Sequence, residues 1–236
     1  MSTLHKFALR ELKKTPASGK EFYMGITDVI NKDYEIINRT KVDFARIICN
    51  LEDDQDRLDF YKYRRRYYDH FGPHCSIYNL IMYYEKNNML IPEYDQLLVD
   101  EFQDFNKMEV RLIKLLSLKN NLLIVGDDDQ SLYSFRYAQP DEIRSMYKSE
   151  DYKKFRLPFC FRCTEVIINA FKDVVTKAKK EGFLTRRIND KEYEYFPTKD
   201  KDEASEKNKH ILVKEKVFNT SVAFHIDKKI KDIYES

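Results

Sequence analysis

Two short apolar runs near the middle of the chain each end abruptly in acidic and amide residues. Leu97–Val99 is followed by Asp100–Asp104, and Leu122–Val125 is followed by Gly126–Gln130. Both runs are too short for helices and lack polar alternation, which predicts strands buried on both faces. Between them, the apolar positions of residues 106–118 recur with a helical period, so the stretch predicts a strand–helix–strand unit with parallel strands. The polar residues are then expected at the carboxyl ends of adjacent strands, where open α/β sheets bind ligands.

The residues at these strand ends suit a site for a metal ion and a nucleotide. Asp100, a carboxylate fixed directly after a strand, is a hard oxygen ligand of the kind that Mg²⁺ prefers. Its neighbour Glu101 is placed to orient or deprotonate a water molecule that attacks a phosphate. Acidic residues often begin the loops that follow strands, so this pair alone has little specificity. The second acidic segment, at the spacing of a strand–helix–strand unit, makes the combination specific.

Both segments resemble motifs of the UvrD/Rep/PcrA-type DNA helicases. Leu98–Asp104 is similar to motif II, the Walker B box, and Val125–Ala138 is similar to motif III. The resemblance implies an α/β fold with a RecA-like parallel sheet of the P-loop NTPase type. It also implies a DNA-repair helicase that couples ATP hydrolysis to translocation on single-stranded DNA and duplex unwinding, with ATP and Mg²⁺ as cofactors.

The start of the chain resembles a third motif. Apolar residues recur on one face of residues 4–12, and Ser2 or Thr3 precedes them, which predicts a capped amphipathic helix. Beside the other motifs, Thr3-Leu4-His5 resembles motif Ib, a Thr-x-His ahead of a helix. The resemblance implies that Thr3 and His5 contact the backbone of single-stranded DNA.

A fourth motif is recognisable with departures. Pro158–Ala170 resembles motif IV, whose family form is Leu-x-x-Asn-Tyr-Arg-Ser ahead of a helix. Arg162 is kept, whereas Phe161 replaces the tyrosine, Cys160 the asparagine and Cys163 the serine. The resemblance implies that Arg162 acts as an arginine-finger analogue on the transferring phosphoryl group and that Phe161 stacks on the adenine.

The same resemblance assigns the remaining site residues. Asp100 and Glu101 lie at the Mg²⁺ ion, Asp100 as its ligand and Glu101 as the residue that activates water. Gln130 senses the terminal phosphate of ATP. On the far side of the motif III loop, three residues are expected in reach of DNA bases: Tyr133, Phe135 and Arg136.

The phosphate-binding loop of P-loop NTPases has no counterpart in the sequence. Its Gly-x-x-x-x-Gly-Lys-Ser/Thr pattern needs a pair of glycines at fixed spacing, and the five glycines of the chain contain no such pair. Ala17–Lys20 looks similar but follows Thr15-Pro16 rather than a buried strand, and Glu21 stands in place of the hydroxyl. We therefore expect the chain to hydrolyse ATP poorly or not at all by itself, with the loop supplied by a second polypeptide or lost from a decayed gene. The alternative is a non-catalytic remnant that binds DNA or a partner.

The pattern divides the chain into two parts. Residues 1–150 are expected to form part of a first RecA-like motor domain, with residues 16–92 as a helical insertion, and residues 151–236 to begin a second one. The clearest amphipathic pieces of the insertion are residues 42–48, 58–68 and 77–86, with Gly72-Pro73 as a break. Within the second piece, Arg64–Arg66 with its flanking tyrosines is interpreted either as a DNA contact or as a solvated helix face with the rings turned inward.

The carboxyl-terminal part has its own pattern. Pro140 is expected to begin a helix and residues 155–157 to form a short strand. Residues 199–209 predict a mobile charged loop. Residues 211–217 predict a strand, and Thr220 or Ser221 is expected to cap a closing helix.

Composition limits the alternatives. With 42 basic and 40 acidic residues in 236, the net charge of +2 requires any DNA-binding surface to be a local patch. The four cysteines do not suggest a secreted disulfide scaffold, and no apolar run is long enough for a membrane span, so an intracellular, soluble protein in a reducing compartment is expected. A zinc site formed by Cys160, Cys163 and ligands from His70–Cys75 is a further hypothesis.

Overall fold

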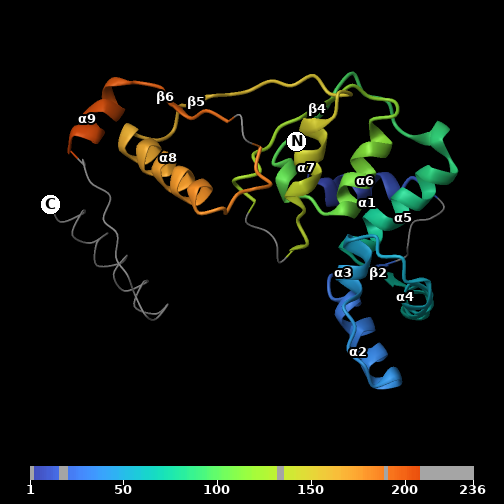
Figure 1. The fold of residues 1–236 in the computed structure, drawn as a ribbon. Coiled ribbons are helices and arrows are strands. Elements are labelled where there is room, and N and C mark those ends of the chain that lie inside the picture. Colours follow the sequence, from blue (N-terminus) through green and yellow to red (C-terminus); the bar gives the residue numbers. More distant parts are fainter. Residues whose placement is uncertain (1–2, 16–20, 132–135, 189–190, 208–236) are drawn as a thin grey trace. The chain divides into compact units, whose positions relative to one another are not determined.

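The first part of the chain contains a pair of parallel strands and the helix that connects them (Figure 1). The computed structural model describes residues 3–15, 21–131, 136–188 and 191–207. These residues fall into two compact units: unit 1 comprises residues 1–154 with 186–188, and unit 2 comprises residues 155–185 with 189–236. Each unit is described by itself.

The predicted strand–helix–strand unit is confirmed. Strand β3 (Leu97–Val99) pairs in parallel with β4 (Leu122–Ile124), with Leu97 opposite Leu122. Helix α6 (Lys107–Leu116) connects them and begins with a capping box, in which Asn106 Oδ1 accepts from the Glu109 N–H and Glu109 Oε2 accepts from the Asn106 N–H. Because the strands are parallel, the loops that follow them leave the same edge of the sheet.

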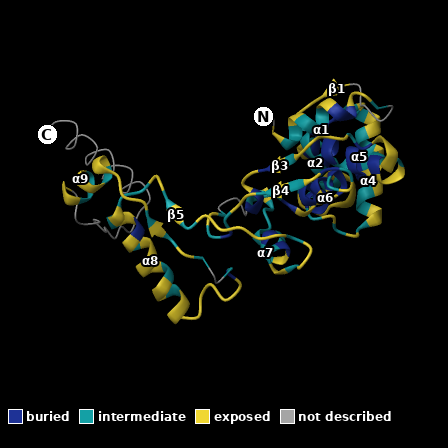
Figure 2. Cartoon of the chain, turned by 90° about the horizontal axis from the view of Figure 1, so that it is seen from above, coloured by how far each residue is buried: buried dark blue, intermediate teal, exposed yellow. Residues whose placement is uncertain are grey.

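The expectation that both strands are buried on both faces is wrong. Val99 is 9% exposed and packs in a cluster with Phe102, Val110 and Ile113, whereas Leu98 is 67% exposed and Leu123 is 41% exposed. Among the described residues, helices cover only one face of this sheet, so successive side chains alternate between core and solvent (Figure 2).

Helix α1 (Leu4–Leu12) is the predicted amphipathic helix. Thr3 caps it, since its Oγ1 accepts from the Lys6 N–H at 3.3 Å. Helix α1 packs on α5 (Pro73–Lys86), and α5 packs on α6. Leu12, Leu80 and Leu112 are fully buried in the resulting core.

The segment between α1 and β3 is mainly helical, as predicted. It contains α2 (Ile26–Asn38), α3 (Phe44–Cys49), α4 (Gln55–Tyr68), α5 and the 3-10 helix η1 (Asn88–Leu90). The break at Gly72-Pro73 is confirmed, because Gly72 precedes α5 and Pro73 is its first residue. The parallel pair β1 (Glu21–Phe22) and β2 (His70–Phe71) was not predicted, since two-residue strands leave no readable period.

Two short elements follow β3 and β4. The 3-10 helix η2 (Phe102–Asp104) follows β3, and α7 (Pro140–Lys148) begins at the predicted proline. Ile143 and Met146 of α7 pack with Val99 and Phe102. Helix α7 therefore helps to cover the buried face of the sheet.

Unit 2 contains β5 (Phe159–Cys160), α8 (Glu165–Lys180), β6 (Glu194–Tyr195) and α9 (Lys199–Lys207), and β5 pairs in parallel with β6. The strand predicted at residues 155–157 is wrong: Leu157 is 87% exposed, no ladder forms there, and the strand begins only after Pro158.

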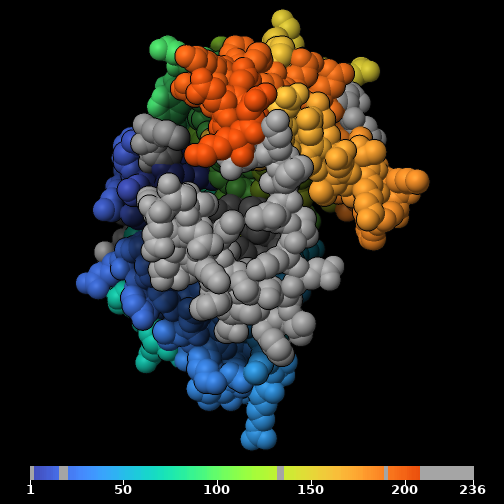
Figure 3. Space-filling view, turned by 90° about the vertical axis from the view of Figure 1, so that its left-hand side faces the viewer, coloured from blue at the N-terminus to red at the C-terminus, as the bar shows by residue number. Residues whose placement is uncertain are grey.

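The loop predicted at 199–209 is wrong over residues 199–207, which form α9 on the surface (Figure 3). Its first turn contains Asp200 and Asp202 and its last contains Lys207, an order of charges that favours a helix. The strand predicted at 211–217 and the helix capped by Thr220 or Ser221 lie outside the described residues. Within the described ranges, none of the helices combines the length and the apolar character that crossing a bilayer requires.

Candidate functional site

Asp100 and Glu101 form a sharp turn at the carboxyl end of β3. Asp100 Oδ1 accepts from the Glu101 N–H at 2.9 Å, and Glu101 has a left-handed backbone with φ of 53°. Both residues are exposed. Within the described residues neither carboxylate forms an ion pair, so both remain open to a cation or to water.

Gln103 joins the loops that follow the two strands, a role that the sequence did not reveal. Gln103 is 1% exposed; its Nε2 donates to Glu101 Oε2 at 2.8 Å, and its Oε1 accepts from the Asp127 N–H at 3.0 Å. At Gly126 an added Cβ would lie 2.7 Å from Gln103 Oε1 and 2.8 Å from Ile143 Cδ1. Only glycine allows this approach, and the position of Gly126 directly after a strand was the one available signal.

Gln130 is exposed and folded back onto its own loop. Its Nε2 donates to Asp127 Oδ2 at 2.9 Å, and its backbone N–H donates to the Asp127 carbonyl at 2.9 Å. Through Asp127 and Gln103, Gln130 and Glu101 belong to one hydrogen-bonded chain across the strand ends.

Two arginines that the sequence analysis missed anchor the other acids of this loop. Arg144 Nε donates to Asp128 Oδ2 at 2.7 Å, and Arg187 Nε lies 2.8 Å from Asp129 Oδ1. The side chains of Asp128 and Arg187 are 0% and 1% exposed. No local pattern predicts such pairs, because their partners are distant in sequence.

Among the described residues, the carboxylates of Asp127, Asp128 and Asp129 lie within 4.8 Å of one another, close enough to be considered as metal ligands. Arginines pair with two of these carboxylates, those of Asp128 and Asp129. The ion pairs anchor the loop and supply the positive charge that a metal ion would otherwise provide. Cys160 and Cys163 gain no third ligand in the described part of the chain, so the zinc hypothesis is not supported.

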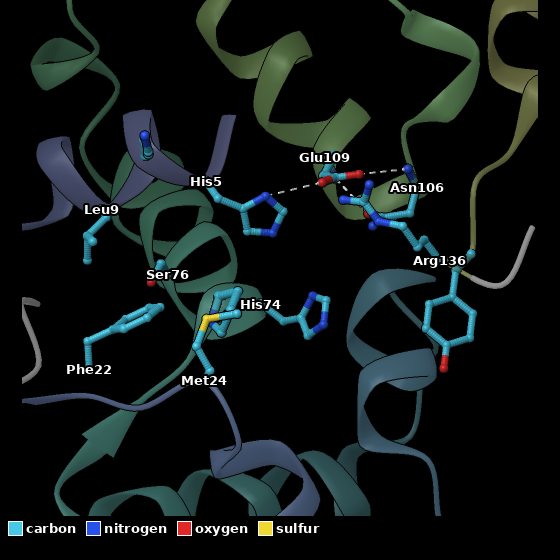
Figure 4. A pocket seen from close by; sticks show the side chains of 12 residues that line it. His5, Leu9, Phe22, Met24, His74, Ser76, Asn106, Glu109 and Arg136 are labelled. Carbon is cyan, nitrogen blue, oxygen red and sulfur yellow. Dashed lines mark hydrogen bonds and ion pairs between the residues drawn. The ribbon is translucent and has the colours of Figure 1, made fainter. Parts of the chain in front are cut away.

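His5 and Arg136, which both resemble DNA-contacting residues, line one pocket of about 540 Å³ in unit 1 (Figure 4). His74, Asn106 and Glu109 lie in its wall. Burial lowers the pKa of His5 to about 4, and the charge of Arg136 and the charge that His74 gains on protonation act in the same direction. Burial raises the pKa of Glu109. His5 is therefore neutral at pH 7, and its 3.7 Å contact with Glu109 becomes an ion pair only on protonation.

Thr3 does not line this pocket, and Phe161 and Arg162 belong to unit 2. Thr3 caps α1, and Tyr133 and Phe135 lie outside the described residues. In unit 2, Arg162 is exposed, and Phe161 is 67% exposed with its ring centroid 4.3 Å from that of Phe196.

At least one arginine of α4, Arg64, is engaged in an ion pair and does not contribute to a basic patch. Arg64 Nε donates to Asp33 Oδ2 at 2.7 Å, and its guanidinium lies 5.0 Å from the ring centroid of Tyr67. Tyr63 and Tyr67 are 65% and 68% exposed, so the interpretation with the rings turned inward is wrong for these two.

Comparisons with known proteins agree on one family. The family model described as UvrD/REP helicase N-terminal domain matches residues 34–151. The chain is 38% identical over 97 residues to DNA helicase II of Haemophilus influenzae, covering 39% of this chain and 13% of the relative. It is 27% identical over 233 residues to the probable DNA helicase II homolog of Mycoplasma capricolum, covering 96% of this chain and 27% of the relative.

A third similar protein is named for its use of ATP. The chain is 38% identical over 114 residues to the ATP-dependent DNA helicase PcrA of Staphylococcus aureus, covering 45% of this chain and 15% of the relative. The chain thus matches between 13% and 27% of the length of these three relatives.

Proposed function

Since the chain belongs to the UvrD/REP helicase family, we propose that unit 1 carries part of the ATP site and part of the single-stranded DNA site of a DNA helicase. One observation carries the proposal: parallel β3 and β4 bring Asp100-Glu101 and Asp127–Gln130 to the same edge, where Gln103 links them. Open α/β sheets bind nucleotides at the carboxyl ends of their parallel strands, which is where these carboxylates and amides lie.

We further propose the domain plan that the sequence suggested. Residues 1–150 form part of a RecA-like motor domain with residues 16–92 as a helical insertion, and residues 151–236 begin a second RecA-like domain. The parallel pair β3 and β4 and the helices at residues 26–86 support the first assignment, and the β5–α8–β6 arrangement supports the second.

The residues present fit a magnesium ion. Asp100 offers an exposed carboxylate whose observed partner is the Glu101 N–H, and no ion pair competes for it in the described residues. Asp100 would hold the ion, with Glu101 beside it. When bound, Mg²⁺ neutralises negative charge on the phosphates of ATP.

Glu101 is the proposed general base. Gln103 holds one of its carboxylate oxygens, Oε2, and the left-handed backbone fixes where the side chain leaves the turn. This positioning leaves Oε1 to accept a proton from, or to orient, the attacking water. Gln130 would contact the terminal phosphate of ATP, and its hydrogen bond to Asp127 would couple that contact to Gln103 and Glu101.

The motif IV residues complete the nucleotide site in the proposal. Arg162 would stabilise negative charge on the transferring phosphoryl group, and Phe161 would stack on the adenine. Both side chains are exposed in unit 2 and are available for these contacts.

The pocket of His5 and Arg136 is the proposed DNA contact. Arg136 supplies a permanent positive charge, and His5 and His74 are neutral donors or acceptors, a combination that suits a phosphate and its neighbouring sugar or base. Thr3, Tyr133 and Phe135 are proposed to extend this contact along the strand.

ATP turnover is proposed to need residues beyond these 236. No pair of glycines in the chain has the spacing of a phosphate-binding loop, so another polypeptide or further sequence would supply that loop. The chain alone is therefore expected to bind single-stranded DNA and to hydrolyse ATP poorly or not at all.

The test combines hydrolysis and binding. ATP turnover by the purified chain is measured with and without single-stranded DNA, beside Glu101→Gln and the exposed control Glu150→Gln. We expect DNA binding by all three proteins and negligible turnover. Clear DNA-stimulated turnover that only Glu101→Gln abolishes would support the role of Glu101. It would contradict the proposal that turnover needs a phosphate-binding loop from outside this chain. Absence of both turnover and DNA binding would contradict the proposed function.

A further inference from the structure

Two half-exposed cysteines bracket the proposed nucleotide residues Phe161 and Arg162. Cys160 ends β5, where it pairs with Tyr195 of β6, and Cys163 lies just before α8. The Cys163 N–H points at Cys160 Sγ, 3.4 Å away. The chain therefore turns back on itself between the two thiols.

The other two cysteines have a different setting. Cys49 is fully buried and its Sγ lies 3.3 Å from His74 Nδ1, and Cys75 is 2% exposed with its Sγ 2.7 Å from Tyr61 Oη. Burial raises the pKa of Cys49 to about 12. Both thiols are shielded from solvent, which makes them unreactive internal references.

Cys160 and Cys163 differ in acidity. The N–H of Cys163 is the main cause of a lowered pKa at Cys160, helped by the Arg162 N–H, the Cys163 thiol and the charge of Lys201 in α9. Burial, followed by the contact with Cys160, raises the pKa of Cys163. Cys160 is thus the thiol that more readily becomes a thiolate, and Cys163 is the one that stays protonated.

We infer that Cys160 and Cys163 form a reversible dithiol–disulfide switch that is oxidised by small-molecule disulfides such as glutathione disulfide. Three observations carry the inference: the C-x-x-C spacing, the turn that brings the Cys163 N–H to Cys160 Sγ, and the partial exposure of both cysteines. A pair of this kind, without further ligands in the described residues, suits redox exchange better than metal binding.

The reaction balances in two exchange steps. The Cys160 thiolate attacks one sulfur of glutathione disulfide, forms a mixed disulfide and releases one glutathione thiolate. Cys163 then loses its proton to solvent and attacks Cys160 Sγ, which releases the second glutathione thiolate. The protein loses two protons and two electrons, and one glutathione disulfide becomes two glutathione thiols once each released thiolate takes up a proton.

The consequence for the nucleotide site rests on the proposed function. A disulfide would close a covalent ring around Phe161 and Arg162 and restrict both backbones. The contact of Phe161 with Phe196 and the placement of Arg162 would then depend on the redox state.

The test uses the full chain, reduced and then equilibrated with defined ratios of glutathione and glutathione disulfide. Free thiols are alkylated without unfolding, and the mass of the whole chain and of its peptides is measured. We expect a reversible loss of two hydrogen atoms confined to the peptide with Cys160 and Cys163, while Cys49 and Cys75 stay reduced. Cys163→Ser should trap glutathione on Cys160, and Cys160→Ser should lower the glutathionylation rate at least about tenfold.

Other outcomes would overturn the inference. These are the absence of a bridge at any glutathione ratio, bridging through Cys49 or Cys75, equal glutathionylation of both serine variants, or stoichiometric zinc on the reduced pair. The wild-type mapping does not depend on whether a variant folds.

A separate readout tests the nucleotide roles. Binding of a fluorescent ATP analogue is compared between the reduced and oxidised chains. If the disulfide forms but the affinity is unchanged, the roles proposed for Phe161 and Arg162 fail while the switch itself stands.

Discussion

Arg187 forms a bidentate ion pair with Asp129, although 58 residues separate them in the chain. Nε of Arg187 lies 2.8 Å and 2.9 Å from the two carboxylate oxygens of Asp129. The backbone N–H of Ile188 donates to Asp128 Oδ2 at 3.2 Å. Residues 186–188 therefore belong to unit 1 and fix the loop that carries Gln130.

Removing Arg187 should destabilise unit 1 strongly. Arg187→Ala removes the buried guanidinium that pairs with the carboxylate of Asp129, whose side chain is 10% exposed, so we expect a loss of about 3–5 kcal/mol in the free energy of unfolding. Chemical denaturation followed by circular dichroism measures it. Arg186→Ala is the matched control, because Arg186 is 73% exposed and its pair with Asp141 should contribute less than about 1 kcal/mol. Equal effects of the two variants would contradict this role of Arg187.

Gly126→Ala should disturb the junction of the two strand ends. Its Cβ would lie 2.7 Å from Gln103 Oε1 and 2.8 Å from Ile143 Cδ1, and both neighbours are held in place, so we expect destabilisation by about 1–3 kcal/mol. At Gly25 an added Cβ meets only the movable side chain of Tyr23, and Gly25→Ala should cost less. Thermal unfolding of both variants measures the difference. A smaller effect at Gly126 than at Gly25 would show that the junction is loose.

The exposed face of the sheet gives a paired prediction. Leu98 is 67% exposed and Val99 is 9% exposed, so Leu98→Thr should change stability by less than about 0.5 kcal/mol, whereas Val99→Ala should cost about 1–2 kcal/mol. Chemical denaturation of the two variants checks this. A large cost at Leu98 would mean that this face is covered in solution.

The stability of unit 1 should fall on acidification in a way that depends on His5. Its pKa is about 4 in the folded chain and 6.5 as the unperturbed value, so the unfolded chain binds the proton first and stability is lost as pH falls from about 6.5 to 4. His74, whose pKa is also lowered, acts in the same direction, whereas Glu109, whose pKa is raised, acts in the opposite one.

A comparison with His5→Asn isolates the contribution of His5. Between pH 7 and 4.5 the wild type should lose up to about 3 kcal/mol more stability than the variant. Denaturant titrations at several pH values provide the measurement, with Arg136 and Glu109 unchanged in both proteins. Parallel pH profiles of the two proteins would mean that His5 is not buried as a neutral ring.

Periodicity predicted several of the helices and strands but not how exposed their residues are. The strand–helix–strand unit at residues 97–124 and the helices that begin at Leu4 and Pro140 could be predicted, because their apolar spacing and caps are local. The exposure of Leu98 could not, since a continuous apolar run does not say which face a neighbour covers.

The sequence predicted the residues at the strand ends of the candidate site but not the contacts that link them. Asp100, Glu101 and Gln130 stand at strand ends that the sequence marks, but the links through Gln103, Arg144 and Arg187 are tertiary contacts without a local signal. The sequence predicted a strand at residues 155–157, whereas the observed strand is Phe159–Cys160. Pro158 has no N–H to donate to a ladder, and the strand begins after it.

The binding of single-stranded DNA tests the central claim most directly. Fluorescence anisotropy of a labelled oligothymidylate is measured with the wild-type chain, with Arg136→Ala and with Lys148→Ala, which removes an exposed charge of α7 that does not line the pocket. We predict that the wild type binds, that Arg136→Ala weakens binding about tenfold or more, and that Lys148→Ala has little effect at the same salt concentration. No binding by the wild type, or equal losses in the two variants, would contradict a DNA site formed around His5 and Arg136.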